Sequence, residues 1–176
     1  MTAVPCFFDV TAEAAAGVAE VQKAFRDKTY WLARLATYGG DSMTLESLEV
    51  GNDGTIVVRT TQDLRKEMLP GGIGRMLPGD TKIMRTESWW AAPGGQQLSG
   101  EFTISARGVP SSGSGTMVLT SLQSGSAVGS SLRVRGTLEV RIPLVGARIE
   151  RYIADQIATE VPQMQLFTAD WIAGEA

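Results

Sequence analysis

The sequence predicts an α+β domain in which a curved antiparallel sheet of about seven strands wraps around a long C-terminal helix. Between residues 132 and 141, apolar and polar side chains alternate, as in an antiparallel strand with one buried face. From 149 to 171, apolar residues recur every three or four positions, which indicates a helix with an apolar stripe. Such a long stripe requires a wide apolar surface. The inner face of a curved sheet provides one, and a cavity commonly remains between the two.

Length and composition are those of one globular domain spanning residues 1–176, with 43% hydrophobic and 20% charged residues. The formal net charge of −3 argues against a nucleic-acid partner, because phosphates attract a basic surface. No apolar run approaches the roughly 20 residues of a transmembrane segment. The N-terminus has no basic region before its apolar residues, and the single Cys6 forms no internal disulfide. We therefore expect a cytoplasmic protein.

The chain contains no histidine. This excludes Ser-His-Asp and Cys-His catalysis as well as histidine-ligated zinc. One cysteine is too few for a thiolate metal cage or an iron–sulfur cluster. The glycine-rich stretch 70–79 lacks the Lys-Ser/Thr ending of a phosphate-binding loop. We expect no metal, nucleotide or covalent cofactor, and the sequence assigns no catalytic residue.

The N-terminal part predicts a short strand over 5–10, followed by two helices. Thr11 is a favourable N-cap for a helix that ends near Phe25. A second helix begins at Thr29 and ends at Gly39 and Gly40.

Six strands then follow, and Gly51-Asn52-Asp53-Gly54 predicts a hairpin turn between the first two. The Ser/Gly tracts 111–115 and 124–131 are of hairpin-loop length. The predicted strands are 43–50, 55–61, 81–90, 97–106, 116–122 and 132–142.

The final helix is predicted to open at Pro143, a residue suited to the first helical turn. Glu150 and Glu160 lie off its apolar stripe and are expected on the polar face. Pro162 should bend the helix, because it removes one backbone hydrogen bond.

The stretch 68–79, "MLPGGIGRMLPG", is apolar but repeatedly interrupted by proline and glycine. Three interpretations stay open: a plug of ordinary core at the open end of the sheet, a mobile gate over a cavity, or a loop that dips into a membrane. Methionine adapts to varied ligands and glycine permits hinging, which is compatible with a gate. The first two interpretations place the stretch at the rim of the cavity.

Arg85 and Glu87 share one face of their strand, and the pattern does not decide which face points inward. Pointing outward, they would form an exposed pair worth at most about 1 kcal/mol. Pointing inward, they would form a buried ion pair and the best polar anchor for a ligand carboxylate or phosphate.

Six segments occur together: "FDVTAEA" (8–14), "YWLARLATYGG" (30–40), "TTQDLRKEMLP" (60–70), "LPGDTKIMRTESW" (77–89), "PLVGARIERYI" (143–153) and "FTADWI" (167–172). They resemble a family of uncharacterised, mainly actinobacterial proteins, a domain of unknown function, within the START-like (SRPBCC) superfamily. That superfamily includes lipid-transfer domains, plant pathogenesis proteins and polyketide cyclases. The resemblance implies the helix-grip fold and a hydrophobic cavity between sheet and C-terminal helix. It implies no single activity.

We therefore expect non-covalent binding of a hydrophobic or amphipathic small molecule, such as a lipid, by a carrier or sensor. Two rivals remain: a cyclase- or dehydratase-type enzyme using Asp, Glu, Arg or Tyr in the cavity, and a protein-interaction module without a cavity. Arg85 and Glu87 are the candidate polar anchor. The candidate apolar lining is Trp31, Leu35, Met68, Leu69, Ile73, Met76, Leu77, Phe102, Ile104, Met117, Leu119, Leu132, Val134, Leu138, Ile149, Ile153 and Ile157.

Overall fold

The computed structural model describes residues 4–65, 69, 71–77 and 81–176. Strands and helices follow one another in the predicted order. They are β1 (Cys6–Ala14), α1 (Val18–Phe25), α2 (Lys28–Gly39), the 3-10 helix η1 (Gly40–Ser42), β2 (Met43–Val50), β3 (Ile56–Leu64), α3 (Ile73–Met76), β4 (Thr81–Ala91), β5 (Gln97–Arg107), β6 (Val109–Ser124), β7 (Ala127–Val140) and α4 (Gly146–Ala173).

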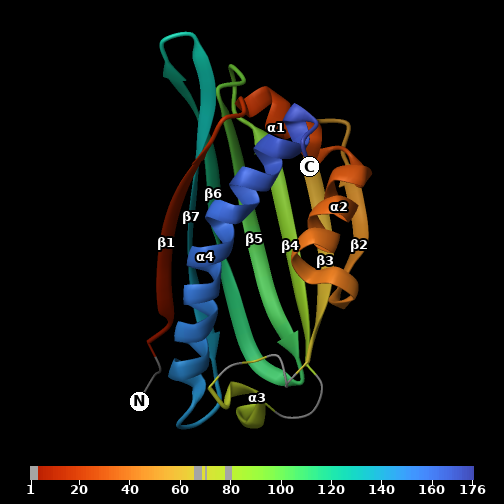
Figure 1. Cartoon of the computed structure of the whole chain (residues 1–176). Helices are drawn as coiled ribbons and strands as arrows, with labels where there is room; N and C mark the ends of the chain where they lie inside the picture. The colour runs from red at the N-terminus through yellow and green to blue at the C-terminus, as the bar shows by residue number, and fades with distance from the viewer. Residues whose placement is uncertain (1–3, 66–68, 70, 78–80) are drawn as a thin grey trace.

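The strands of the described residues form one antiparallel sheet in the order β1-β7-β6-β5-β4-β3-β2. The first strand therefore pairs with the last, and the others follow as successive neighbours. Figure 1 shows the sheet bending around α4, with α1 at one end, α3 at the other, and α2 between them on the side of β3 and β2. Helix α4 packs mainly on β1 and β7. The predicted fold class, a curved antiparallel sheet of seven strands around a long C-terminal helix, is confirmed.

Strand β1 is longer than predicted, and Thr11 is not a helix N-cap. The segment pairs with β7 from Cys6 opposite Leu138 to Ala14 opposite Ser130. Helix α1 begins only at Val18, after Gly17. The alanine-rich composition of 12–16 favours a helix locally, but a complete ladder of hydrogen bonds with a neighbouring strand outweighs a preference of a few tenths of a kcal/mol per residue.

The Ser/Gly tract 111–115 is not a loop but part of β6. A Cβ added to Gly113 would collide with Ile104 and lie 2.7 Å from a methyl group of Leu138. On β7, a Cβ at Gly136 would lie 2.8 Å from the ring of Phe8. Glycine suits these two positions because larger side chains of neighbouring strands fill the space that a Cβ would occupy. The second tract also belongs largely to strands, since only residues 125 and 126 separate β6 from β7.

Helix α4 begins at Gly146, three residues after Pro143. A side chain at Gly146 would collide with the backbone carbonyl of Val140, so the helix starts in close contact with the end of β7. The helix then continues through Pro162, which is exposed. Glu150 is buried, contrary to its predicted place on a polar face, because its carboxylate accepts the backbone N–H of Val140 at 2.7 Å.

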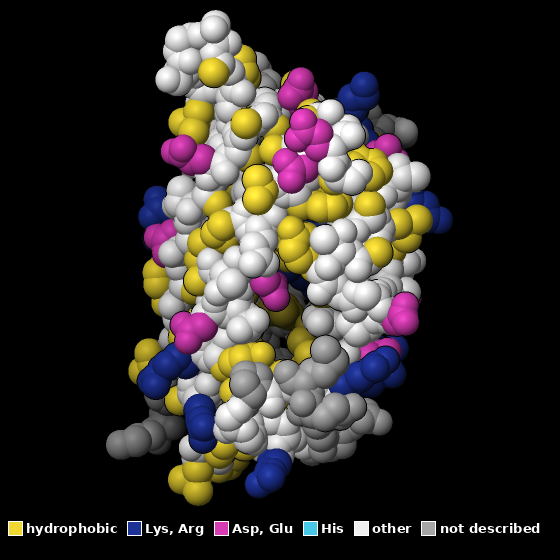
Figure 2. Space-filling view, in the orientation of Figure 1, with side chains coloured by type: hydrophobic (Ala, Val, Ile, Leu, Met, Phe, Trp, Pro, Cys, Tyr) yellow, Lys and Arg dark blue, Asp and Glu magenta, His cyan; other side chains and the backbone are white. Residues whose placement is uncertain are grey.

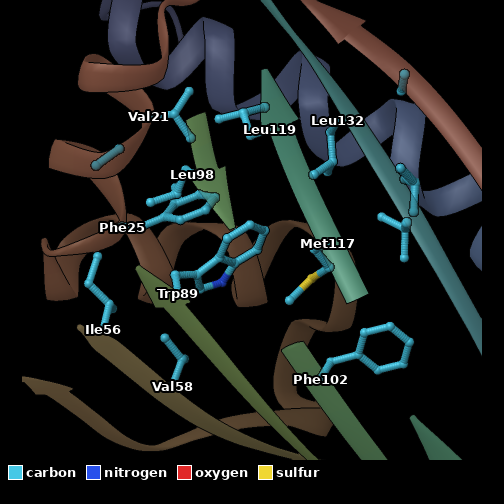
Figure 3. Close-up of a cluster of buried hydrophobic side chains, with 14 of the residues drawn as sticks. Val21, Phe25, Ile56, Val58, Trp89, Leu98, Phe102, Met117, Leu119 and Leu132 are labelled. Atoms are coloured by element: carbon cyan, nitrogen blue, oxygen red, sulfur yellow. The ribbon is translucent and has the colours of Figure 1, made fainter. Parts of the chain in front are cut away.

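The main core fills the end of the sheet covered by α1 and α2. Figure 3 shows Phe25 and Trp89 in contact there, with Leu98 and Leu119 beside them. The ring centroids of Phe25 and Trp89 lie 5.0 Å apart. Trp31 is fully buried behind them and donates its indole N–H to the carbonyl of Phe25 at 2.8 Å. Buried side chains in mutual contact fill this end of the molecule.

Candidate functional site

A cavity of about 370 Å³ lies between the inner face of the sheet and α4. Every strand contributes at least one residue to its walls, and α2, α3 and α4 complete them. Figure 2 shows a hollow between α4 and α2, above α3, with apolar side chains inside and an acidic one at its edge. Ligand pockets typically measure about 300–1,000 Å³, so this cavity suits a small molecule.

Nine of the predicted lining residues line the cavity. Ile149, Ile153 and Ile157 belong to one face of α4, which confirms that the apolar stripe faces the sheet. The remaining six come from β5, β7 and the stretch around α3: Phe102, Ile104, Val134, Leu69, Ile73 and Leu77.

Seven others lie outside the cavity wall, and Met68 falls outside the described residues. Trp31, Met117 and Leu119 belong to the main core near α1 and α2. Leu138 faces the same way as Val134 but packs over Gly113. The alternating pattern identifies which residues of a strand face inward. It does not show which of these inward-facing residues contact packed core and which line the cavity. Leu35, Met76 and Leu132 complete the group that does not line the cavity.

The described part of the stretch predicted as plug or gate forms part of the cavity wall at the α3 end. Ile73 and Leu77 are buried against Val109, Val140 and Ile149, a second cluster separate from the main core. Both side chains also line the cavity. The described part of this stretch is thus core and cavity wall at once, and gating stays a prediction.

The backbone here restricts how gating can be tested. Gly71 and Gly72 have φ values of 65° and 77°, where alanine is strained. The carbonyl of Gly71 also accepts a hydrogen bond from Arg148 at 3.0 Å. Alanine substitutions would therefore change strain together with any hinge motion.

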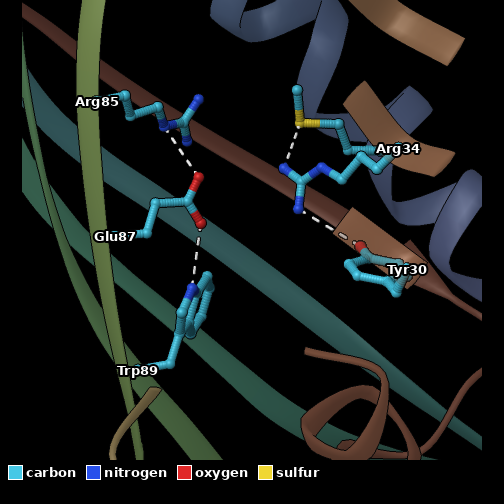
Figure 4. A network of polar contacts seen from close by, with 6 residues as sticks. Tyr30, Arg34, Arg85, Glu87 and Trp89 are labelled. Carbon is cyan, nitrogen blue, oxygen red and sulfur yellow. Dashed lines mark hydrogen bonds and ion pairs between the residues drawn. The ribbon is translucent and has the colours of Figure 1, made fainter. Parts of the chain in front are cut away.

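Arg85 and Glu87 point inward, which decides the alternative that the sequence left open. Nε of Arg85 lies 2.9 Å from Oε1 of Glu87, although its N–H is not aligned well enough for a hydrogen bond. The other carboxylate oxygen accepts the indole N–H of Trp89 at 3.1 Å. Figure 4 shows this chain of contacts along β4. Arg85 lines the cavity, whereas Glu87 lies behind it and is only 5% exposed.

A second arginine, Arg34, is buried and approaches from α2. Arg34 donates to the hydroxyl of Tyr30 at 3.4 Å and contacts the sulfur of Met164 at 2.8 Å, as Figure 4 shows. Its guanidinium carbon lies 4.9 Å from the centre of the Trp31 ring. Burial acts to raise the pKa of Glu87, but Arg85, Arg34 and the Trp89 indole outweigh burial and hold that pKa below its ordinary value. Glu87 is therefore ionised at neutral pH and provides one negative charge near the two arginines.

Glu160 of α4 is a cavity residue that sequence reasoning placed on the polar face. Burial raises the pKa of this carboxyl, and the charges of Arg85 and Arg34 offset the rise only in part. Its position three residues after Ile157 matches the spacing of the apolar stripe, and this spacing could have revealed it. Tyr38, also missed, lines the cavity from α2 and donates its hydroxyl to the carbonyl of Gln163 at 2.6 Å.

Replacing Glu160 with glutamine should raise the free energy of unfolding at about pH 8 and change it little at about pH 4. A carboxyl whose pKa is higher in the folded state opposes folding above that pKa, and the penalty disappears below the unfolded-state value of about 4.3. Urea unfolding of both proteins at the two pH values measures this, with the exposed Glu101→Gln as control. A gain in the free energy of unfolding that is larger at about pH 4 than at about pH 8 would contradict a raised pKa for Glu160.

Within the part of the chain that the structure describes, no helix is long and apolar enough to cross a membrane. The same residues contain no group of three or more Cys, Asp or Glu side chains placed to hold a metal ion.

The sheet, the helix that it wraps and the cavity between them define the helix-grip fold. Solved structures share this fold over nearly the whole chain. A conserved protein from Geobacillus kaustophilus is 13% identical, with 96% of each chain covered and a TM-score of 0.57. The protein TTHA0849 from Thermus thermophilus is 15% identical, with 97% of this chain and 99% of that chain covered and a TM-score of 0.55. Ara h 8.0201 is 13% identical, with 97% and 99% covered and a TM-score of 0.52.

The chain belongs to the family described as protein of unknown function (DUF2505), whose model matches residues 9–172. Relatives from Mycobacterium tuberculosis (strain ATCC 25618 / H37Rv) and Mycobacterium bovis (strain ATCC BAA-935 / AF2122/97) are both described as uncharacterised proteins. Each is 37% identical over 177 residues, which cover 96% of this chain and 98% of the relative. The resemblance to an actinobacterial family of unknown function is confirmed.

Proposed function

We propose that this protein binds a hydrophobic or amphipathic small molecule non-covalently in the cavity between the sheet and α4, as a carrier or sensor. The observation that carries the proposal is the cavity itself, about 370 Å³ with largely apolar walls. A space of this size lined by isoleucine, leucine and phenylalanine gains free energy when apolar surface replaces water in it. The rival interaction module without a cavity requires a filled interior, and the 370 Å³ space argues against it.

The test is a titration with an anilinonaphthalene-sulfonate probe, whose fluorescence rises in apolar surroundings. We expect one saturable site with a dissociation constant of micromolar order, which corresponds to about −8 kcal/mol. Decanol should displace the probe competitively, because both occupy the same apolar space. Non-saturable fluorescence, or a saturable signal that decanol leaves unchanged, would count against the proposal.

A cyclase- or dehydratase-type enzyme is the second candidate, and one observation favours it. Glu160 is a carboxyl with a raised pKa on the cavity wall, and Arg85 lines the same space. A carboxyl tuned toward neutral pH can act as a general acid or base when it touches a substrate. Turnover of a bound ligand that is lost in Glu160→Gln, while binding is retained, would identify an enzyme. Unchanged ligand after prolonged incubation identifies a binding protein.

A further inference from the structure

We propose that the ligand is an amphipathic carboxylic acid of about a dozen non-hydrogen atoms, whose carboxylate is bound by Arg85. This inference rests on the proposed function, because it names the chemical class of molecule that the same cavity accepts. Four features of the site support it: the free edge of one guanidinium, the balance of charges around it, the apolar surface opposite, and the volume.

Arg85 presents an unused hydrogen-bonding edge to the cavity. Its Nε side faces Glu87, and its guanidinium carbon lies 5.8 Å from the centre of the Phe102 ring. Among the described residues, neither terminal amino group forms a hydrogen bond or an ion pair. About 30% of the side chain is exposed, and Arg85 is a cavity-lining residue. Two adjacent N–H donors on a planar fork match the two oxygens of a carboxylate.

The charges around this edge favour an anion when Glu160 is protonated. Arg34 and Arg85 contribute two positive charges, and Glu87 contributes one negative charge behind them. Burial favours the neutral form of Glu160, which leaves one positive charge uncompensated. Protonated Glu160 could also donate a hydrogen bond to a ligand carboxylate. The ammonium group of a cationic ligand could not accept this hydrogen bond. A bound anion and a neutral Glu160 therefore support each other.

The other charged groups on the wall do not oppose an anion at Arg85. Asp63 lies at the β3 end of the wall and is paired with Lys82 at 3.7 Å. Arg65, also on the wall, adds positive charge at the same end. The phenols of Tyr38 and Tyr152 line the cavity from α2 and α4, and a neutral phenol can accept or donate a hydrogen bond.

The rest of the cavity suits an apolar tail of limited length. Ile73, Leu77 and Ile149 form apolar wall at the α3 end. At about 30 Å³ per group of the size of one water molecule, 370 Å³ holds about a dozen non-hydrogen atoms. Decanoate has this size, and we expect its tail to lie between α4 and α3 with its carboxylate toward β4.

Isothermal titration calorimetry with decanoate, decanol and decylamine separates the head-group preference from binding of the tail. The informative variant is Arg85→Met with Glu87→Gln, which removes both charges together and keeps an acceptor for the indole N–H of Trp89. Replacing both members of a buried pair is tolerated far better than removing one. The matched control is Arg59→Met with Glu49→Gln, an exposed pair with an N–O distance of 2.8 Å on β3 and β2.

We expect decanoate to bind the wild type at least about tenfold more tightly than either decanol or decylamine. In the Arg85/Glu87 double variant this preference should vanish while decanol binds as before, and the Arg59/Glu49 control should behave as wild type. In Glu160→Gln, decanoate should bind more tightly than to wild type at about pH 8, because no negative charge remains to be neutralised. Equal binding of decanoate and decanol by wild type, or a preference that survives in the double variant, would overturn the inference. If decanol itself does not bind, the proposed function fails instead.

Discussion

Replacing Glu87 with alanine should lower the free energy of unfolding by about 3–5 kcal/mol. The substitution leaves Arg85 and Arg34 without their buried counter-charge and removes the acceptor of the Trp89 indole N–H. A buried charge that loses its partner keeps its full desolvation penalty, which makes this change more costly than most truncations. Urea denaturation at neutral pH measures the difference.

Two controls separate this effect from general disruption. Glu49→Ala removes a carboxylate from the exposed pair with Arg59 and should cost no more than about 1 kcal/mol. The double variant Arg85→Met with Glu87→Gln should cost less than Glu87→Ala, because no cation is left alone on β4. A loss for Glu87→Ala no larger than for Glu49→Ala would show that Glu87 does not compensate the arginines.

The contribution of Glu87 should depend on pH in a defined direction. Its pKa is lower in the folded protein than the ordinary value, so its ionisation stabilises the fold above the unfolded-state pKa of about 4.3. This stabilisation is lost as the pH falls through the folded-state pKa. The difference in stability between wild type and Glu87→Ala should therefore shrink in acid.

Replacing Ile157 with tryptophan should weaken binding of the naphthalene-sulfonate probe on the order of 100-fold while the protein stays folded. Ile157 lines the cavity and is only partly buried, so an indole can extend into the empty space without displacing packed core. Ligand and indole cannot occupy the same volume. Leu138 is a poorer choice, because it is already buried and packs over Gly113.

The matched control for this variant is Ala158→Trp, which places the same indole one residue further along α4 on an exposed position. It should bind the probe as wild type does. Circular dichroism and urea denaturation establish that both variants are folded. Equal weakening in the two variants, or none in Ile157→Trp, would place the probe outside the cavity.

The architecture was predictable where one element shows its period without interruption. The alternation over 132–141 identified β7, and the stripe from Ile149 to Trp171 identified α4 and the face that it buries. The start of α1 was not predictable in the same way. Whether residues 11–14 form strand or helix depends on the neighbouring β7, which lies more than a hundred residues away in the sequence.

The candidate site was predictable only in part, for two physical reasons. Strand β4 carries large apolar residues on both faces, with Trp89 inward and Trp90 outward, so its own pattern could not orient Arg85 and Glu87. Pairing with β3 and β5 decides the orientation. The second reason is the position of a residue along the inner face of the sheet. Leu119 and Val134 both face inward, but Leu119 packs in the core near α1 and α2, whereas Val134 lines the cavity.

The central claim, that the ligand occupies the cavity between the sheet and α4, is tested most directly by isoleucine methyl NMR during titration with decanoate. Of the isoleucines in the sequence, Ile56, Ile142 and Ile172 lie outside the cavity wall and act as internal controls. The isoleucines of the wall are Ile73, Ile83, Ile104, Ile149, Ile153 and Ile157. We predict chemical-shift changes and ligand-to-methyl nuclear Overhauser effects at the methyl groups of the wall, with the three controls unmoved. Overhauser effects from decanoate to the control methyl groups, with none to those of the wall, would contradict the claim.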